Sequence, residues 1–328
     1  MVRYAVIGTS WITESFIQGT NTFGGLKLTA VYSRSKEKGE AFAKKYNAEY
    51  VFDNLEKMAE SDKIDAVYIA SPNVFHYSQS KLFLENGKHV ICEKPITVEP
   101  EELIKLQSLA KEKNLIYMEA IMMLHLPQRK VIKEALCKIG KITSARFDFS
   151  QFSSKYEALT QGEIPNIFNP KMATGCLMDL GIYCIYPAID FFGEPKEIIN
   201  RATFLKTGAD SVNNAVFIYP DKQVNISCSK VGQSHSGSEI MGDKGTITIS
   251  SISKLTDMDL ILQNGEKENL VGNIEKHILM SYEAKSFYNY ITDFEKYKDE
   301  YYENNKITLT VSKIMKKMRD NAGISFDF

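Results

Sequence analysis

The first part of the chain alternates between short apolar runs and longer amphipathic stretches. The apolar runs span residues 3–7, 26–32, 64–70, 89–92 and 115–119. Helical patterns separate them, such as residues 36–46 and the segment that Pro100 opens. Strands that alternate with helices in this way form a parallel, doubly wound sheet with right-handed crossovers. The pattern therefore predicts an α/β Rossmann domain over residues 1–121.

From residue 141 onward the pattern changes to the two-residue alternation of half-buried strands. This alternation covers residues 141–152, 197–206, 213–219, 224–230, 238–241, 246–249 and 259–262. Asp221–Lys222 and Gly242–Gly245 are typical of tight turns between strands. The sequence therefore predicts a second, sheet-rich α+β domain over residues 122–328. Helical patterns end the chain, and its C-terminal helix is able to pack back on the first domain.

Composition narrows the class of protein. The chain has 328 residues, 44% hydrophobic and 25% charged, as expected for two globular domains. A net charge of −1 gives no electrostatic basis for binding nucleic acid or an anionic membrane. The chain starts directly with a strand and no apolar run approaches about 18 residues, so we expect a cytoplasmic protein without a membrane span. Its five cysteines and five histidines show no ligand spacing, which predicts no metal site.

The first strand ends in a candidate phosphate-binding turn. Strand, glycine and helix follow one another through Gly8, Thr9, Ser10, Trp11 and Ile12. In dinucleotide-binding domains such a helix start holds the pyrophosphate on free backbone N–H groups. The match to Gly-x-Gly-x-x-Gly is imperfect. Serine at position 10 still allows close backbone approach, whereas a threonine at the third glycine position should push the helix slightly outward.

The end of the second strand selects the cofactor. An acidic residue there binds the ribose 2′-hydroxyl of NAD, whereas arginine with small hydroxyl neighbours suits the 2′-phosphate of NADP. This chain has Ser33 and Arg34 and no acid at that place. We therefore expect NADP, with NAD possible; the competing interpretation is a solvated arginine at a helix start.

Two further strand ends carry polar residues. Val90–Cys92 leads into Glu93, Lys94 and Pro95, and an amine at the carboxyl end of a parallel strand points into the ligand crevice. Burial or a nearby positive charge lowers the pKa of such a lysine toward neutrality. An ordinary surface lysine is the competing interpretation.

The preceding strand ends in a polar turn at the same edge of the predicted sheet. The strand ends there at Ser71, Pro72 and Asn73. His76 begins the next helix. It either reaches the nicotinamide end or the substrate, or only caps its helix.

These motifs, taken in order with Met118-Glu119-Ala120, resemble those of the glucose-fructose oxidoreductase/inositol dehydrogenase (Gfo/Idh/MocA) family over essentially the whole chain. The resemblance implies a Rossmann domain followed by a domain with a large, mostly antiparallel, open-faced sheet, and it implies that this second domain, residues 122–328, binds substrate and forms the oligomer. It implies a cis bond between Lys94 and Pro95. The uncovered sheet face then suggests a homodimer or higher homo-oligomer.

The resemblance also identifies residues in the second domain. Asp179 and Tyr183 lie four residues apart, so a helix places them on one face. Without the family, a solvated helix face would explain them. The family uses an aspartate and, four residues later, a histidine or tyrosine, and tyrosine resembles the branch of dimeric dihydrodiol dehydrogenase. That branch tends to have an arginine where this chain has Met122-Met123-Leu124, which favours a less polar substrate.

The resemblance implies an NAD(P)-dependent oxidoreductase that transfers a hydride between NADP(H) and a hydroxyl or carbonyl carbon of a sugar, polyol or trans-dihydrodiol. Tyr183 would move the hydroxyl proton, and Lys94 would lower the tyrosine pKa from about 10 and bind the substrate oxygen. Asp179 would orient a substrate hydroxyl or Lys94, and Glu93 would support the nicotinamide or the loop. The alternatives are a redox-neutral epimerase or glycosidase that retains its cofactor, and a non-catalytic dinucleotide- or sugar-binding regulator.

Overall fold

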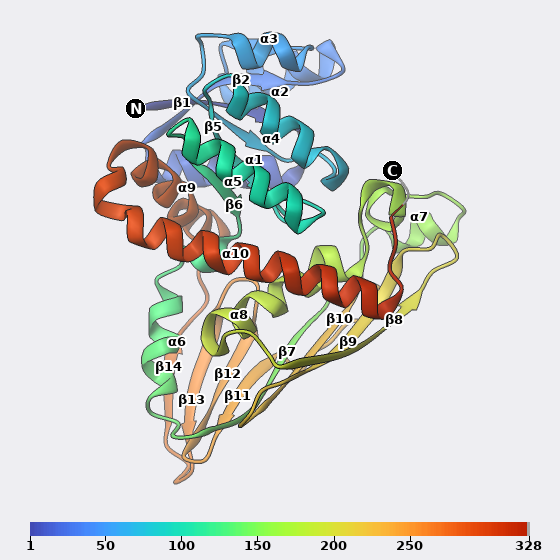
Figure 1. The fold of residues 1–328 in the computed structure, drawn as a ribbon, viewed down its shortest axis with the longest axis vertical. Coiled ribbons are helices and arrows are strands. Elements are labelled where there is room, and N and C mark those ends of the chain that lie inside the picture. Colours follow the sequence, from blue (N-terminus) through green and yellow to red (C-terminus); the bar gives the residue numbers. More distant parts are fainter. Residues whose placement is uncertain (327–328) are drawn as a thin grey trace. The chain divides into compact units, whose positions relative to one another are not determined.

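A six-stranded parallel sheet organises residues from both ends of the chain. The computed structural model describes residues 1–326, which divide into two units. Unit 1 comprises Met1–His125 and Glu275–Leu309, and unit 2 comprises Leu126–Ile274 and the residues from Thr310 onward. A long helix, α10 (Phe294–Ala322), contributes residues to each (Figure 1).

The sheet of unit 1 has the order β3-β2-β1-β4-β5-β6 with every neighbouring pair parallel. This is the strand order of a dinucleotide-binding Rossmann fold, so the predicted doubly wound sheet is confirmed. Its strands are β1 (Val2–Ile7), β2 (Leu26–Tyr32), β3 (Tyr50–Phe52), β4 (Ala66–Ile69), β5 (His89–Glu93) and β6 (Tyr117–Ala120). The pattern of apolar residues did not predict β3, because three residues carry too little periodicity.

Helices cover both faces of this sheet. They are α1 (Trp11–Phe23), α2 (Lys36–Tyr46), α3 (Leu55–Glu60), α4 (His76–Glu85), α5 (Pro100–Glu112) and α9 (Lys276–Thr292), with 3₁₀ turns η1 (Asn73–Phe75) and η2 (Met122–Leu124). The alternation of β1 divides its side chains between two cores, with Tyr4 and Val6 in one and Ala5 and Ile7 in the other.

The first of these cores contains a helix from late in the sequence. Met280, Ala284 and Phe287 of α9 pack among residues of β1, β2 and α1. The two helices approach closely, because a Cβ on Gly19 would lie 2.6 Å from the Cβ of Met280. Glycine at this position of α1 therefore permits the contact that completes the layer.

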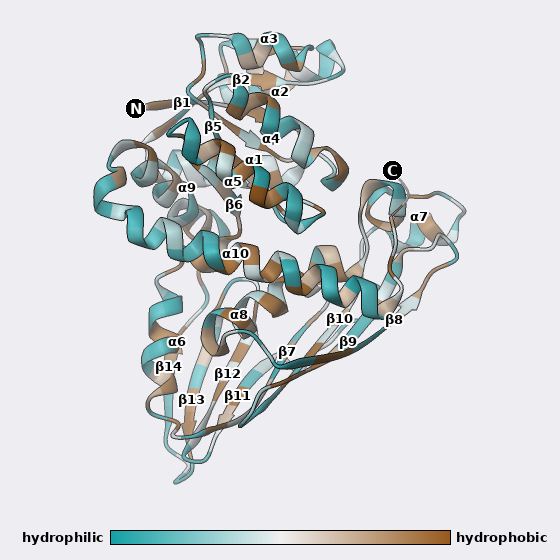
Figure 2. Cartoon of the chain, in the orientation of Figure 1, coloured by the Kyte–Doolittle hydropathy of each residue, from teal (hydrophilic) through white to brown (hydrophobic). Residues whose placement is uncertain are grey.

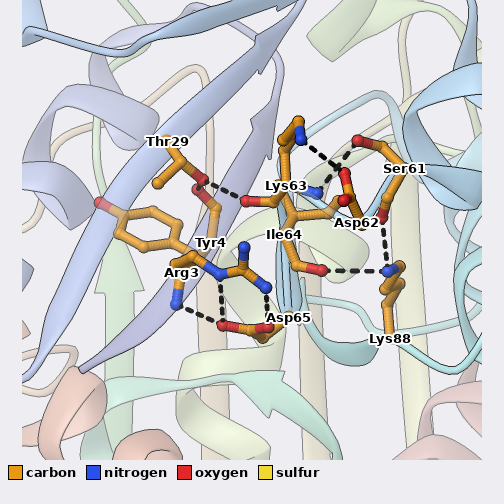
Figure 3. A network of polar contacts seen from close by, with 9 residues as sticks. All are labelled: Arg3, Tyr4, Thr29, Ser61, Asp62, Lys63, Ile64, Asp65 and Lys88. Atoms are coloured by element: carbon orange, nitrogen blue, oxygen red, sulfur yellow. Dashed lines mark hydrogen bonds and ion pairs between the residues drawn. The ribbon is translucent and has the colours of Figure 1, made fainter.

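The strand starts of unit 1 are joined by a polar network (Figure 3). The guanidinium of Arg3 donates to Asp65 at 2.6 Å, and Lys88 Nζ donates to the carbonyls of Ser61 and Ile64 at 2.7 and 3.0 Å. These contacts lie at the amino ends of β1, β4 and β5. Ligands of such sheets bind at the opposite, carboxyl edge. The network therefore stabilises the sheet without taking part in the site.

Unit 2 is built on an eight-stranded sheet with the order β14-β13-β12-β11-β7-β10-β9-β8. Among these described strands only the β7–β10 pair is parallel, which confirms the mostly antiparallel sheet. The strands are β7 (Ile142–Ser150), β8 (Glu197–Phe204), β9 (Asp210–Ile218), β10 (Gln223–Ser229), β11 (Ser238–Gly242), β12 (Gly245–Ser251), β13 (Thr256–Leu262) and β14 (Lys267–Val271). The last was not predicted, because its polar sequence lacks alternation.

The helical segments of unit 2 are short. They are α6 (Gln128–Leu136), α7 (Tyr156–Thr160), the 3₁₀ turns η3 (Asn166–Phe168) and η4 (Pro170–Met172), the π-helix η5 (Leu177–Gly181) and α8 (Ile182–Phe192). Helix α8 packs on β7 and β10. Polar residues are interspersed among apolar ones along the strands (Figure 2), and Ile198, Val224 and Ile240 are among those that point to the buried face.

One segment corrects the expectation that no apolar run is long enough to cross a membrane. Pro170–Phe192 is long and apolar enough to cross a membrane by length and composition alone. Its most apolar 18-residue window has a mean hydropathy of 1.4, but 78% of that window is buried inside the structure. Such burial is that of a core helix, because packing in unit 2 supplies the apolar surroundings that lipid would otherwise provide.

Candidate functional site

The turn after β1 has the geometry of a phosphate-binding turn. Gly8 has a φ of 101°, and a Cβ there would lie 2.6 Å from the carbonyl oxygen of Ala70 at the end of β4. Helix α1 then begins with Ser10 as N-cap, whose side chain makes no capping hydrogen bond. The N–H groups of the first turn of a helix have no intrahelical acceptor. The turn therefore fits the pyrophosphate of a dinucleotide.

The Gly8→Ala variant is expected to lose about 1–3 kcal/mol of stability through its left-handed backbone and to bind NADPH at least about tenfold more weakly, since the new methyl group displaces the Ala70 carbonyl. Urea unfolding and fluorescence titration measure the two effects. Gly24→Ala is the matched control, because Gly24 also has a positive φ of 85° but a Cβ added there would meet no atom within 4 Å. Equal NADPH affinity in the two variants would contradict the assignment of the turn.

Threonine at the third glycine position is accommodated inside the unit. Thr13 is fully buried, and its hydroxyl oxygen has no hydrogen-bond partner among the described residues. Two residues earlier, Trp11 is 68% exposed, and Lys276 Nζ of α9 lies 3.9 Å from its ring centroid. Sequence reasoning missed Lys276, since nothing in its local sequence connects α9 with the phosphate-binding turn.

The candidate cofactor-selecting residues lie at the start of α2. The hydroxyl of Ser33 accepts a hydrogen bond from the N–H of Ser35, and the hydroxyl of Ser35 caps the helix by accepting from the N–H of Lys38. Arg34, which lies between them, is exposed. Both serine hydroxyls thus accept hydrogen bonds that shape the turn, and the side chain between them, Arg34, carries a positive charge.

The segment that carries Lys94 is held by buried side chains. The Lys94–Pro95 bond is cis, as the resemblance implied. Glu93 accepts from the hydroxyl of Tyr68 at 2.6 Å and from the N–H of Lys94 at 3.3 Å, and Glu119 accepts from the N–H of Ile96 at 2.8 Å. Burial raises the pKa of Glu93, although Lys94 and Tyr68 oppose this effect. The carboxylates therefore fix the backbone around Lys94.

His76 joins this segment to the turn after β4. Its ring nitrogens lie 2.8 Å from the carbonyl oxygens of Pro95 and Ser71, and the residue is completely buried. Burial lowers the pKa of His76, and Lys94 lowers it further, although the two carbonyls oppose them. Pro72 is the N-cap of η1, which begins at Asn73. Because one ring nitrogen of His76 contacts the carbonyl of Pro95 and the other that of Ser71, the residue links the turn after β5 to the turn after β4.

The Met122-Met123-Leu124 segment lies in unit 1 and packs largely in its interior. Met123 and Leu124 are buried, and Met122 packs partly buried against the core of unit 1. The prediction of a less polar substrate stays a prediction.

The candidate residues of unit 2 lie on one continuous helical segment. Asp179 belongs to the π-helix η5, and Tyr183 follows in the first turn of α8. The sequence predicted an ordinary helical spacing; a π-turn is frequent at functional sites but has no sequence signature in this chain. The ring of Tyr183 packs edge-on against Phe149 with centroids 5.4 Å apart.

Asp179 has a partner that the sequence did not reveal. The Nζ of Lys230 donates to its Oδ2 at 2.5 Å. Lys230 directly follows β10, and its side chain is 1% exposed, whereas that of Asp179 is 32% exposed. Among residues 1–326 no group of three or more His, Cys, Asp or Glu side chains is arranged to hold a metal ion.

Comparisons with known proteins identify the family. Residues 2–121 match the oxidoreductase family with an NAD-binding Rossmann fold, and residues 130–248 match the GFO/IDH/MocA C-terminal domain. The chain is 39% identical over 327 residues to scyllo-inositol 2-dehydrogenase (NADP(+)) IolU of Bacillus subtilis, a match that covers 99% of this chain and 98% of the relative. The chain belongs to the GFO/IDH/MocA oxidoreductase family. It is an NAD(P)-dependent oxidoreductase, which confirms the resemblance found in its motifs.

Other relatives are more distant. Trans-1,2-dihydrobenzene-1,2-diol dehydrogenase of Mus musculus is 26% identical over 274 residues, 81% of this chain and 79% of that protein. A 3-ketoreductase from Actinomadura kijaniata, solved in complex with NADP and TDP-benzene, superposes with a TM-score of 0.85 at 22% identity over 98% of each chain. The last similarity shows that the fold of this oxidoreductase is shared.

Proposed function

We propose that this oxidoreductase is an NADP-dependent dehydrogenase of polyols of the inositol type. The observation that carries the proposal is the 39% identity, over almost the full length of both chains, to an NADP-dependent scyllo-inositol dehydrogenase. Ser33 and Arg34, with no acid at the end of β2, support NADP. Trans-dihydrodiols form the second substrate class, supported by the more distant relatives.

In this proposal residues 1–121 bind the cofactor and residues 122–328 bind the substrate. The turn from Gly8 to Ile12 would hold the pyrophosphate, Ser33 and Arg34 the 2′-phosphate, and the residues around Asn73 and Lys94 the nicotinamide side. Bound NADP(H) supplies the hydride chemistry at the carbinol carbon.

The protein's own residues handle the proton. During oxidation Tyr183, as the phenolate, takes the substrate hydroxyl proton and becomes the phenol, and during reduction the phenol returns that proton to the substrate oxygen. Lys94 donates a hydrogen bond to the reacting oxygen, which stabilises negative charge on it. Asp179 accepts a hydrogen bond from a neighbouring substrate hydroxyl. Glu93 supports the backbone of Lys94, consistent with its two hydrogen bonds.

The test is a fluorescence titration with NADPH and NADH, followed by turnover assays with scyllo-inositol, other inositols, aldoses and trans-dihydrodiols. We expect tighter binding of NADPH and turnover of an inositol. Tight cofactor binding by the wild-type protein without turnover or exchange would favour the redox-neutral enzyme or the regulator.

The Arg34→Ala variant should raise the Kd for NADPH about 10- to 100-fold and leave that for NADH nearly unchanged, because only NADPH carries the 2′-phosphate. Equal losses of affinity for both cofactors would contradict the role of Arg34.

The proposal includes assembly in the cytoplasm as a homodimer through the open face of the eight-stranded sheet. Ile199 is 50% exposed and Ile261 37% exposed on strands β8 and β13, where side chains alternate with buried ones. Exposed apolar side chains on an otherwise regular sheet suit contact with a second copy. A molar mass of one chain by light scattering would contradict this assembly.

A further inference from the structure

Lys230 is a buried lysine to which the proposed mechanism assigns no role. Lysine is almost never fully buried unless it is paired, and removing two charges from water costs several kcal/mol per ion. The side chain of Lys230 is 1% exposed and ends 2.5 Å from Oδ2 of Asp179. The two side chains therefore differ in exposure: Lys230 is buried in unit 2, while about a third of the Asp179 side chain is exposed to solvent.

The backbone of Lys230 is fixed on two sides. Its N–H donates to the carbonyl of Ser211 at 2.9 Å, and its own carbonyl accepts from the N–H of Ser153 at 2.9 Å. The ring of Phe168, itself fully buried, has its centroid 5.8 Å from the ammonium. These contacts leave Nζ little room to move, so the position of Lys230 determines where Oδ2 of Asp179 lies.

A second buried group secures the same helical segment. Asp210 at the start of β9 accepts from the N–H of Leu177 at 2.8 Å. Its other oxygen would be 1.9 Å from a Cβ on Gly175, so glycine is required there. Burial raises the pKa of Asp210 to about 6, although Lys230 opposes this effect. Two contacts thus hold the π-helix: Asp210 of β9 binds its first residue, Leu177, and Lys230 after β10 binds Asp179.

We propose that Lys230 is a positioning residue that holds the carboxylate of Asp179 in one orientation for a substrate hydroxyl. The inference rests on the role of Asp179 in the proposed function and adds a residue to it. A buried ion pair seldom stabilises a fold more than apolar side chains of the same size would. The arrangement instead commits one carboxylate oxygen to Lys230 and leaves the exposed part of Asp179 to face a ligand.

The decisive experiment is a double-mutant cycle of Lys230→Met and Asp179→Asn in kcat/KM for the best polyol. Lys230→Met should lower kcat/KM about 100-fold with unchanged Kd for NADPH, since a displacement of about 1 Å in a positioning group has an effect of this size. In the Asp179→Asn background the same substitution should change kcat/KM by less than about threefold. Lys222→Met is the matched control, because Lys222 also pairs with an aspartate, Asp221, at 2.6 Å and is 14% exposed.

Two results would overturn the positioning role: kcat/KM within about twofold of wild type in Lys230→Met, or the same loss in both backgrounds of the cycle. Crystal structures of the wild type and Lys230→Met provide a readout that needs no turnover. Asp179 should leave its wild-type rotamer in the variant, and an unchanged rotamer would contradict the proposal. A wild-type protein without polyol turnover contradicts only the proposed function, since the rotamer comparison still decides the role of Lys230.

Discussion

Replacing Lys94 with methionine is expected to lower kcat for polyol oxidation by about 10²- to 10⁴-fold, the range for a group that stabilises or transfers a proton in the transition state. The backbone on either side of Lys94 is held by Glu93 and Glu119 and by the contact of His76 with Pro95. None of these three contacts uses the ammonium group. The segment should therefore keep its position, and the Kd for NADPH should change only a few-fold.

Steady-state kinetics and fluorescence titration of the same protein separate the two effects. Lys88→Met is the control, because Lys88 belongs to the network at the opposite edge of the same sheet and donates to two carbonyls there (Figure 3). It should reduce stability, since two partly buried carbonyl acceptors lose their donor, but leave kcat within about twofold. A Lys94→Met enzyme that keeps wild-type kcat would exclude the lysine from the reaction.

The second large effect is expected for Tyr183→Phe. Phenylalanine keeps the ring that packs against Phe149 and removes only the hydroxyl, so the fold of α8 should be unchanged. If the phenol moves the substrate proton, kcat should fall about 10²- to 10⁴-fold, with a smaller change in KM.

Single-turnover measurement of hydride transfer identifies the affected step. Tyr156→Phe is the control, because Tyr156 is another partly buried tyrosine of unit 2 in contact with aromatic rings. It should behave as the wild type. Unchanged hydride transfer in Tyr183→Phe would remove Tyr183 from proton transfer and leave Lys94 as the candidate group.

Local sequence was informative wherever the chain had a regular period or a strand end. The run of β2 at residues 26–32 and the helix at 36–46 were predicted with the bounds that the structure shows. Gly8 and Lys94 were recognised because parallel strands deliver their carboxyl ends to one edge. Short or polar elements escaped, as β3 has three residues and β14 shows no alternation of buried and exposed positions.

The sequence by itself therefore determined the fold class, the family and the candidate residues Lys94, Asp179 and Tyr183, because each depends on periodicity or on a motif within a short segment. Only the tertiary structure revealed the α9 layer on α1, the buried role of His76 and the pairing of Asp179 with Lys230. Those contacts join side chains that are far apart in the chain. Burial and packing decide them, and no local pattern records which distant side chain supplies the partner charge.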